Sequence, residues 1–271
     1  MIFNNPSGSS SVFEGFTGFY GNSSAATAII TNTAAEVAGI DSGQTYFTNT
    51  ARAGSATVIC NGANVSGAGG GTCFFTGNST ADNAILTAMG GANGGAGGLI
   101  QFDDSTTADS ARVVLSGNGT LNISFHALGP LTLGSLEGDG GEVTLGGKSL
   151  VVGSNDFDTV FGGQIQEHGS VTKTGTGTLT LSGANTYTGA TVVSAGALKA
   201  ANRSGSATGT GALNVNAGTL AGKGTISGAV TIGTGSGSGA FLAPAAGTNV
   251  QAMLTIQSAL TFNADATYAY T

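Results

Sequence analysis

The sequence feature that most constrains the fold is an internal repeat in the first half of the chain. Four phenylalanines recur at nearly constant intervals: Phe19, Phe47, Phe75 and Phe102. Four Ala-x-x-Ala pairs and four aliphatic residues keep the same spacing: Ala25/Ala28, Ala53/Ala56, Ala81/Ala84 and Ala108/Ala111, with Ile30, Val58, Leu86 and Val113. The period is about 27–28 residues, and a fixed period between about 20 and 50 residues is typical of solenoids, propellers and other repeat arrays.

Composition narrows this choice. The chain has 271 residues, of which 49 are Gly and 3 are Pro, and 8% are charged although 40% are hydrophobic. Disordered chains carry more charge, collagen needs Gly at every third position, and a chain so rich in Gly is a poor former of long helices. Propeller blades are longer, at roughly 40–50 residues. We therefore predict an all-β fold, a parallel β-helix (β-solenoid) with about 24–28 residues per coil.

Stacking of the coils predicts where the repeated residues lie. Successive coils of a solenoid pair at about 4.8 Å, so that equivalent side chains lie above one another. We expect the phenylalanines and the aliphatic residues to form two interior ladders. We expect each Ala-x-x-Ala pair to mark a corner too narrow for large side chains.

The second half repeats more loosely. Short segments of alternating hydropathy, nearly all flanked by Gly, Asn or Ser, predict strands at 131–133, 143–145, 150–152, 179–181, 191–193, 213–215, 230–232 and 254–256. Four lysines recur at nearly equal intervals: Lys148, Lys173, Lys199 and Lys223. Their spacing, about 25 residues, is close to the predicted coil length and predicts one exposed row of lysines along the coils.

Cys60 and Cys73 are the two cysteines of the chain, and the twelve residues between them are turn-forming types. A disulfide that closes this loop is the first interpretation, and it suits an oxidising compartment. The alternative is two small buried thiols. Two cysteines cannot build a zinc site without further ligands, and His126 and His168 lie far away in the sequence.

Residues 171–199 contain a dense motif of Gly, Leu, Thr and Asn. Its defining positions are Lys173, Gly175, Gly177, Leu179, Leu181, Gly183, Asn185, Tyr187, Gly189, Thr191, Gly196 and Leu198. This segment closely resembles the autotransporter-associated β-strand repeat, also called the passenger-associated transport repeat, whose pattern it fills at every position. The resemblance extends to 161–165 and 218–232, and covers about 130–271 well, although the usual Pro-Gly turn is Pro244-Ala245 here.

The resemblance implies a right-handed parallel β-helix in the passenger of a type V secretion (autotransporter-like) surface protein. Such a passenger is extracellular, on the bacterial cell surface, and is anchored in the outer membrane by a translocator barrel that we expect outside this chain. The repeat is implied to assist passenger folding and outer-membrane transit. We accordingly expect a fragment of a larger passenger with three parts: 27/28-residue coils at 1–125, transitional coils at 126–170, and the coils that contain the repeat at 171–271.

The motif also has a mechanical interpretation. Leu179 and Leu181 should both point inward from one strand. The glycines at 175, 177, 183 and 189 should permit turns with positive φ. Asn185 should bond to backbone at a corner, and Tyr187 should cover the coil edge with its hydroxyl in water.

The net charge and the acidic clusters of the chain indicate which partners and which catalytic sites are plausible. The net charge of −7 argues against a nucleic-acid partner. A catalytic site on this scaffold would need clustered carboxylates, and three groups are candidates: Asp103/Asp104/Asp109 near Arg112, Glu137/Asp139/Glu142, and Asp156/Asp158. Solubilising surface charge is the simpler interpretation of these acids, and we expect no enzyme, no metal and no cofactor.

Three functions stay open from the sequence. The first is a non-catalytic structural or adhesive segment of a surface passenger, with host or environmental glycans or surface proteins as partners. The second is an extracellular glycan-binding module, and the third is a polysaccharide lyase or hydrolase. Unpaired strand edges at the ends of a solenoid also predict end-to-end self-association.

Overall fold

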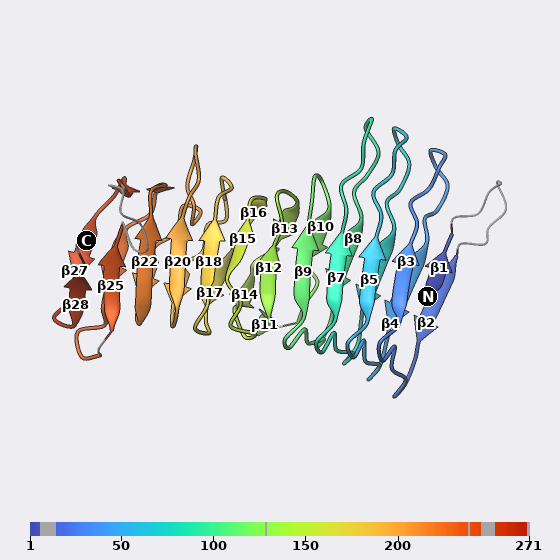
Figure 1. Cartoon of the computed structure of the whole chain (residues 1–271), viewed down its shortest axis with the longest axis horizontal. Coiled ribbons are helices and arrows are strands. Elements are labelled where there is room, and N and C mark those ends of the chain that lie inside the picture. The colour runs from blue at the N-terminus through green and yellow to red at the C-terminus, as the bar shows by residue number, and fades with distance from the viewer. Residues whose placement is uncertain (6–14, 128, 238, 245–252, 270–271) are drawn as a thin grey trace.

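The computed structural model describes residues 1–5, 15–127, 129–237, 239–244 and 253–269. Parallel strands stack along one long axis, with the first strands at one end and the last strands at the other (Figure 1). Every named strand pair is parallel, and the structure is all-β, as predicted. In these described residues we find no helical segment with the length and hydropathy needed to span a bilayer.

Consecutive strands alternate between faces of the solenoid. The first face is two six-stranded sheets that follow one another: β1 (Ile2–Asn4), β3 (Ile29–Asn32), β5 (Thr57–Cys60), β7 (Ile85–Ala88), β9 (Arg112–Leu115) and β12 (Ser135–Glu137), then β15 (Thr159–Phe161), β18 (Thr178–Leu181), β20 (Ala197–Ala200), β22 (Gly218–Gly222), β25 (Ala240–Ala243) and β28 (Ala266–Tyr268). A parallel bridge between Gly138 and Phe161 joins the two sheets.

The second face is a seven-stranded sheet: β2 (Phe16–Phe19), β4 (Gln44–Phe47), β6 (Thr72–Phe75), β8 (Leu99–Phe102), β10 (Thr120–Asn122), β13 (Glu142–Thr144) and β16 (Gln164–Gln166). The third face is β11 (Pro130–Leu133), β14 (Lys148–Val152), β17 (Gly169–Lys173), β19 (Thr191–Val193), β21 (Leu213–Val215), β24 (Val230–Ile232) and β27 (Leu260–Phe262). A two-stranded sheet pairs β23 (Thr225–Ile226) with β26 (Thr255–Ile256).

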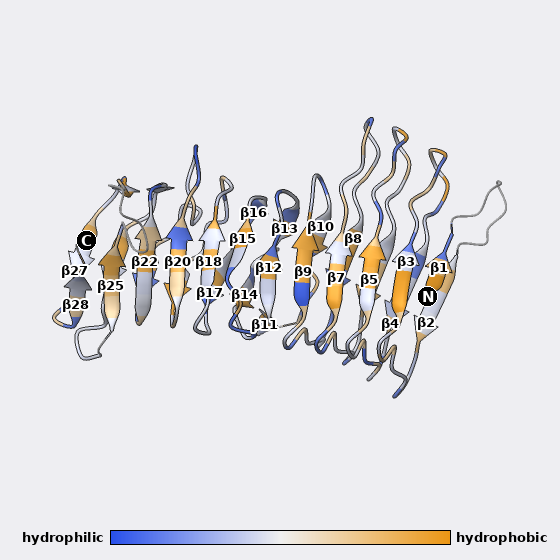
Figure 2. Ribbon diagram, viewed as in Figure 1, coloured by the Kyte–Doolittle hydropathy of each residue, from blue (hydrophilic) through white to orange (hydrophobic). Residues whose placement is uncertain are grey.

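The strands form because apolar side chains alternate with polar ones, so one row of each strand enters the core. In β4 to β9 the second and fourth residues are buried and the first and third are partly exposed. The hydrophobic colour therefore concentrates on the strands and is weaker in the loops (Figure 2).

Both predicted ladders are confirmed. Ile30 pairs with Val58, Val58 with Leu86 and Leu86 with Val113, and all four side chains are fully buried. The rings of the four repeated phenylalanines stack in sequence, with centroids 4.7, 4.8 and 4.6 Å apart and planes inclined by 6°, 6° and 7°.

The Ala-x-x-Ala pairs are tight corners, as expected. The second Ala of each pair donates its N–H to the carbonyl of the first, at 2.9, 3.2, 3.0 and 2.8 Å. The residue after the first Ala has a positive φ in all four coils: Ala26, Gly54, Asp82 and Asp109. A left-handed residue and two small side chains reverse the chain within each corner.

Coil length changes along the axis. The register step from Ile30 to Val58 equals the step from Val58 to Leu86, but the step from Val113 to Leu136 is shorter. The steps from Phe161 to Leu181 and from Leu181 to Ala200 are shorter still. The prediction of about 24–28 residues per coil thus holds for the early coils and is wrong for most of the second half, where a coil takes about 20 residues.

The longer early coils contain stacked loops, at 33–43, 61–71 and 89–98, that extend beyond the strands (Figure 1). Buried alanines join them: Ala35, Ala63 and Ala68. Backbone bonds also link one loop to the next, such as Ala63 N–H to the carbonyl of Ala96 at 2.8 Å. Shortening of these loops after Gly98 accounts for much of the shorter coil.

The interior of the first coils contains polar pairs. Thr17 donates to Asn4 Oδ1 at 2.7 Å, and one coil later Thr45 donates to Asn32 Oδ1 at 2.8 Å. The register places Cys60 and Cys73 at the same two positions of the next coil, and Ala88 and Ile100 in the coil after that: Asn32 to Cys60, Thr45 to Cys73, Cys60 to Ala88 and Cys73 to Ile100.

Candidate functional site

The motif at 171–199 occupies little more than one coil, from β17 to β20. Val171 of β17 pairs with Thr191 of β19, in the next coil. Leu179, Leu181 and Leu198 are buried, which confirms that both leucines of β18 point inward. The coil therefore has a conventional apolar core, and its special features lie at its corners.

Lys173 is buried at the end of β17, with 1% of its surface exposed. Its Nζ donates to the backbone carbonyls of Thr174, Gly175 at 3.0 Å, and Ala195 at 3.5 Å in the next coil. Burial lowers the pKa of Lys173, while Asp156 and Asp158 act in the opposite direction. The lysine thus binds the turn that follows it to the coil that comes after.

The predicted exposed lysine row is wrong. Lys173 pairs with Val152 and Val193 on the third face, whereas Lys199 pairs with Thr180 and Ala221 on the first face. The coils here advance by about 20 residues, so a longer lysine spacing cannot keep equivalent positions in register.

Asn185 binds backbone in the coils on both sides. Its Oδ1 accepts the N–H of Ile165 at 2.7 Å, and its Nδ2 donates to the carbonyl of Ala207 at 2.6 Å. The side chain is 3% exposed. The expectation of a corner residue bonded to backbone is confirmed, and the contacts span three consecutive coils.

Tyr187 differs from expectation. It is fully buried, and its hydroxyl lies 2.5 Å from Thr191 Oγ1 rather than in water. Burial raises the pKa of Tyr187. Thr191 is also a motif position. The motif therefore contains both the buried tyrosine and the hydroxyl group that serves as its hydrogen-bond partner.

Most of the motif glycines are needed because neighbouring backbone leaves no room for a side chain. Among the four glycines predicted to have positive φ, only Gly175 does, at 66°. A Cβ at Gly177, Gly183 or Gly189 would lie 2.4, 1.9 or 2.0 Å from a backbone carbonyl oxygen of the preceding coil. Gly196, also in the motif, has a φ of 64°.

Two acids that precede the motif bind it from the coil before. Asp156 Oδ1 accepts the N–H of Thr176, and Asp158 Oδ1 accepts the N–H of Thr178, both at 2.6 Å. Hydrogen bonding to Thr176 lowers the pKa of Asp156. The sequence analysis placed this pair among catalytic candidates and did not predict that the two acids bind the next coil. The sequence does contain a sign of this contact, because Asp-x-Asp and Thr-x-Thr lie one coil length apart.

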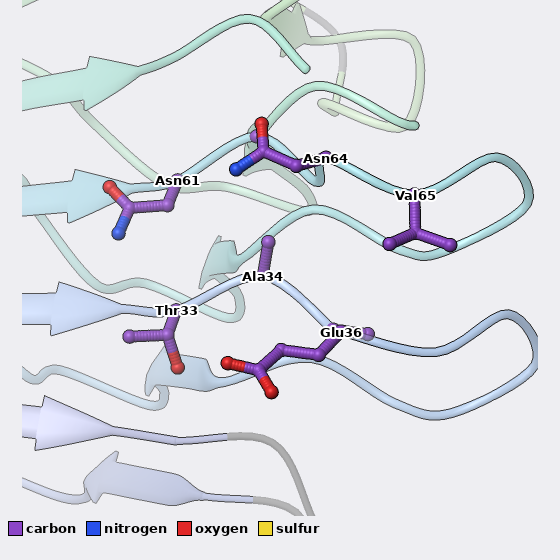
Figure 3. Close-up of a pocket in the computed structure, with 8 residues that line it drawn as sticks. Thr33, Ala34, Glu36, Asn61, Asn64 and Val65 are labelled. Atoms are coloured by element: carbon purple, nitrogen blue, oxygen red, sulfur yellow. The ribbon is translucent and has the colours of Figure 1, made fainter. Parts of the chain in front are cut away.

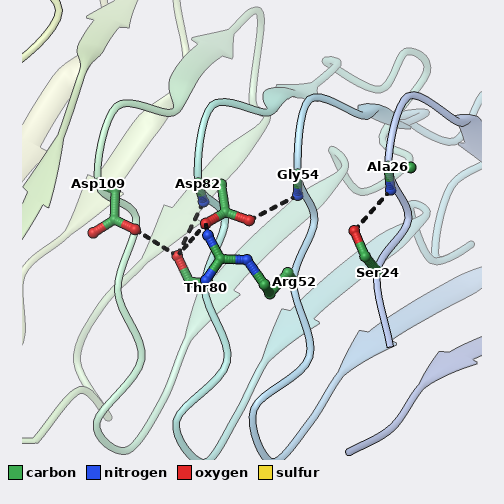
Figure 4. A network of polar contacts seen from close by, with 7 residues as sticks. All are labelled: Ser24, Ala26, Arg52, Gly54, Thr80, Asp82 and Asp109. Atoms are coloured by element: carbon green, nitrogen blue, oxygen red, sulfur yellow. Dashed lines mark hydrogen bonds and ion pairs between the residues drawn. The ribbon is translucent and has the colours of Figure 1, made fainter. Parts of the chain in front are cut away.

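The candidates Asp104 and Asp109, and Asp82, which the sequence analysis did not single out, lie at corners of the early coils. Thr80 donates to Asp109 at 2.8 Å, and Asp82 receives Gly54 N–H at 3.0 Å and pairs with Arg52 (Figure 4). Gly77 N–H donates to Asp104 at 2.9 Å. Each bond joins neighbouring coils.

Asp103 and Glu137 also have partners within reach. Gln101 Nε2 lies 3.0 Å from both carboxylate oxygens of Asp103, whose pKa burial raises. Arg112 pairs with Glu137 at 2.9 Å and lies over the ring of Phe157. Glu142 is the first residue of β13, on the second face, and Asp139 lies in the turn between β12 and β13.

His126 Nε2 is 2.9 Å from the carbonyl of Thr106, and His168 Nδ1 is 3.0 Å from Thr188 Oγ1. Within the described ranges, no three His, Cys, Asp or Glu side chains gather in a way that could hold a metal ion.

The structure does not contain the predicted disulfide. Cys60 and Cys73 are free and fully buried, on facing strands of one coil. Burial raises the pKa of Cys60 to about 12 and raises that of Cys73 well above its usual range. This arrangement corresponds to the alternative of two small buried thiols.

A shallow pocket of about 240 Å³ opens between the first two stacked loops (Figure 3). Its lining is Thr33, Ala34, Ala35, Glu36, Asn61, Gly62, Asn64 and Val65. Pockets that enclose small molecules are larger, at roughly 300–1,000 Å³.

Comparison with known proteins agrees with the geometry. Residues 171–200 match the family model of the passenger-associated-transport-repeat. No curated protein and no solved structure matched the chain. The matched range holds both Lys173 and Asn185, the buried polar residues that bind adjacent coils. Residues 171–200 are therefore a repeat of the kind found in autotransporter passengers, which implies an extracellular or cell-surface location.

Proposed function

We propose that this chain is a non-catalytic structural segment of a bacterial surface passenger of the autotransporter type, and that the repeat at 171–200 assists folding and outer-membrane transit. The observation that carries the proposal is Asn185, whose two amide contacts reach the coil before and the coil after. The passenger repeat match supports the cellular context.

Polar contacts link each coil of this region to the next. Asp156 and Asp158 bind backbone N–H groups of the following coil, and Lys173 and Asn185 each bind a carbonyl one coil further on. A buried polar group without a partner costs about 1–3 kcal/mol. The buried amide of Asn185 thus lacks one partner until the coil of Ala207 is in place, which suits a chain that emerges from a membrane end first and folds coil by coil.

The positions of the acids support a non-catalytic role. Asp104, Asp109, Asp156 and Asp158 bind groups of a neighbouring coil and Glu137 pairs with Arg112, so these carboxylates act as links between coils.

Surface display tests the proposal. The 271-residue chain is placed between a secretion signal and an outer-membrane translocator, and surface-exposed protein is measured by protease accessibility in intact cells. Asn185→Ala should lower display several-fold and slow refolding of the purified chain. Asn214→Ala is the matched control, since Asn214 is the partly exposed middle residue of β21. Display and refolding of Asn185→Ala equal to those of the control would contradict the proposal.

A further inference from the structure

The outer side of the second face has a row of aromatic side chains. Tyr46 of β4 pairs with Phe74 of β6, and both lie in the outward positions of their strands. Their ring centroids are 4.7 Å apart with planes inclined by 25°. Phe16, half exposed, lies against Tyr46 in a tilted arrangement, with ring centroids 5.3 Å apart and planes inclined by 40°. This row is separate from the buried phenylalanine ladder on the same strands.

Tyr20 extends the row at its start. Gly18 is the register partner of Tyr46, and a Cβ at Gly18 would lie 2.3 Å from Cε2 of the Tyr20 ring. The ring of Tyr20 therefore covers the position that Gly18 leaves empty, and it remains 56% exposed. The column begins with three aromatic rings over three consecutive coils.

The rings of this row offer apolar surface to solvent. Phe16 is 50% exposed and Tyr20 is 56% exposed, and Tyr46 and Phe74 are partly exposed. The C–H groups of a ligand can pack against these exposed ring surfaces.

Amide side chains continue the same column. The register partner of Phe74 is Gln101 on β8, which pairs with Asn122 on β10. Asp103 fixes the amide nitrogen of Gln101, and the oxygen of Gln101 lies 3.5 Å from Nδ2 of Asn122. Asn122 Oδ1 in turn accepts from the N–H and hydroxyl of Ser124, at 2.9 and 2.6 Å. These contacts hold both amides in defined orientations before any ligand arrives.

The face is almost uncharged although the protein has a net charge of −7. The aromatic and amide column continues through Thr144 to Gln166 without an ionisable group other than tyrosine hydroxyls. The neighbouring outward column has one charged residue, Glu142: Phe16, Gln44, Thr72, Leu99, Thr120, Glu142 and Gln164. The carboxylates at its border are Glu142 and Asp103, which binds Gln101, and the two columns contain no Lys or Arg, so the surface does not attract polyanions.

We propose that this column, from Tyr20 to Asn122, binds a neutral linear oligosaccharide that runs along the solenoid axis. A pyranose ring has an apolar C–H face, which fits the aromatic end, and a rim of hydroxyls, which fits amide donors and acceptors. Five positions at about 4.8 Å span roughly 19 Å, the reach of a short sugar chain. The inference goes beyond the structural role proposed above and does not depend on it.

Calorimetric titration of the purified 271-residue chain with cellohexaose and hexa-N-acetylchitohexaose, both neutral, tests the site. Tyr46→Ala and Phe74→Ala should each weaken binding at least about tenfold. Gln101→Ala, which leaves the rings in place, should weaken it several-fold. Phe125→Ala is the matched control, since Phe125 is an aromatic residue that is 66% exposed and lies outside this column; it should bind like the unchanged chain. Circular dichroism confirms that each variant is folded.

Three results would overturn the proposal. The first is no binding of either hexasaccharide at millimolar concentration. The second is binding that the three column variants leave unchanged. The third is tighter binding of a heparin hexasaccharide than of both neutral sugars, because an anionic ligand needs cations that this face lacks. If Tyr46→Ala or Phe74→Ala fails to fold, Gln101→Ala and the heparin comparison still decide the outcome.

Discussion

Phe47 and Phe75 lie face to face in the interior, with ring centroids 4.8 Å apart and planes inclined by 6°. Each ring also stacks on the equivalent ring of its other neighbouring coil. The ladder links four coils through one type of contact, so a change in a middle ring affects two interfaces.

Phe75→Ala should lower the free energy of unfolding by about 3–5 kcal/mol, because it leaves a cavity and breaks two stacking contacts. Chemical denaturation measures this change. Phe74→Ala is the control, since Phe74 is adjacent in the sequence but lies on the outer side of β6. Equal losses for the two variants would show that the inner ladder has no special role.

Gly183→Ala tests whether the motif glycines serve close packing. A Cβ there would lie 1.9 Å from the carbonyl oxygen of Gly163, although the φ of Gly183 is not in the left-handed region. Gly147→Ala is the comparison, because Gly147 has a φ of 83° and open space around a Cβ. We expect about 1–2 kcal/mol of destabilisation at Gly147, the cost of a left-handed φ for a residue with a Cβ, and clearly more at Gly183. The reverse order in thermal unfolding would contradict the packing argument.

Asp265 should give the C-terminal coils an acid-sensitive contact. Backbone N–H groups of Thr234, Gly235 and Gly237 bind its carboxylate at 3.1, 2.6 and 3.1 Å, and they lower its pKa. A carboxyl whose pKa is lower in the folded state stabilises the fold at pH values above its unfolded-state pKa. That stabilisation is lost as the pH falls through the folded-state pKa. The melting temperature of Asp265→Asn should therefore lie below that of the unchanged chain at about pH 6, and the gap should close towards about pH 2. A gap that is constant with pH would exclude this linkage.

The two thiols should be unreactive in the native protein. Burial and a pKa of about 12 for Cys60 keep it protonated and inaccessible. A maleimide should label neither cysteine in buffer and both in denaturant without reductant, as read by mass spectrometry. Absence of labelling in denaturant would show that a disulfide does form between Cys60 and Cys73.

The sequence was most informative where one residue type recurs at one interval. The four phenylalanines and the Ala-x-x-Ala pairs keep their register, so their interior and corner positions could be predicted. The lysines also recur, but the coils of the second half are shorter than the lysine spacing, and Lys173 and Lys199 fall on different faces. The spacing of one residue type gives the coil length only when other positions of the coil repeat at the same spacing.

Side-chain partners were harder to predict than strands. Tyr187 has a polar hydroxyl, which favours water, and only the fold shows that Thr191 Oγ1 lies within reach. The contacts of Asn185 and Asp156 depend on which coils are adjacent, and local residue preferences do not contain that information. The passenger repeat was recognisable from its residues, whereas the polar bonds that explain several of those residues were not.

The polar pairs inside the first coils have a consequence for folding accuracy. A chain of similar coils can in principle stack a coil on the wrong neighbour and still bury its phenylalanine and aliphatic rows. The pairs Asn4/Thr17 and Asn32/Thr45 have no counterpart in the coil of Ala88 and Ile100. A misplaced coil would keep the pair Asn32/Thr45, but it would lose the bond from Asn4 Nδ2 to Asn32 Oδ1 and place the pair against hydrocarbon, a costly arrangement. The similar positions of the coils would allow several stacking orders. The polar residues that differ between coils thus select one of these orders.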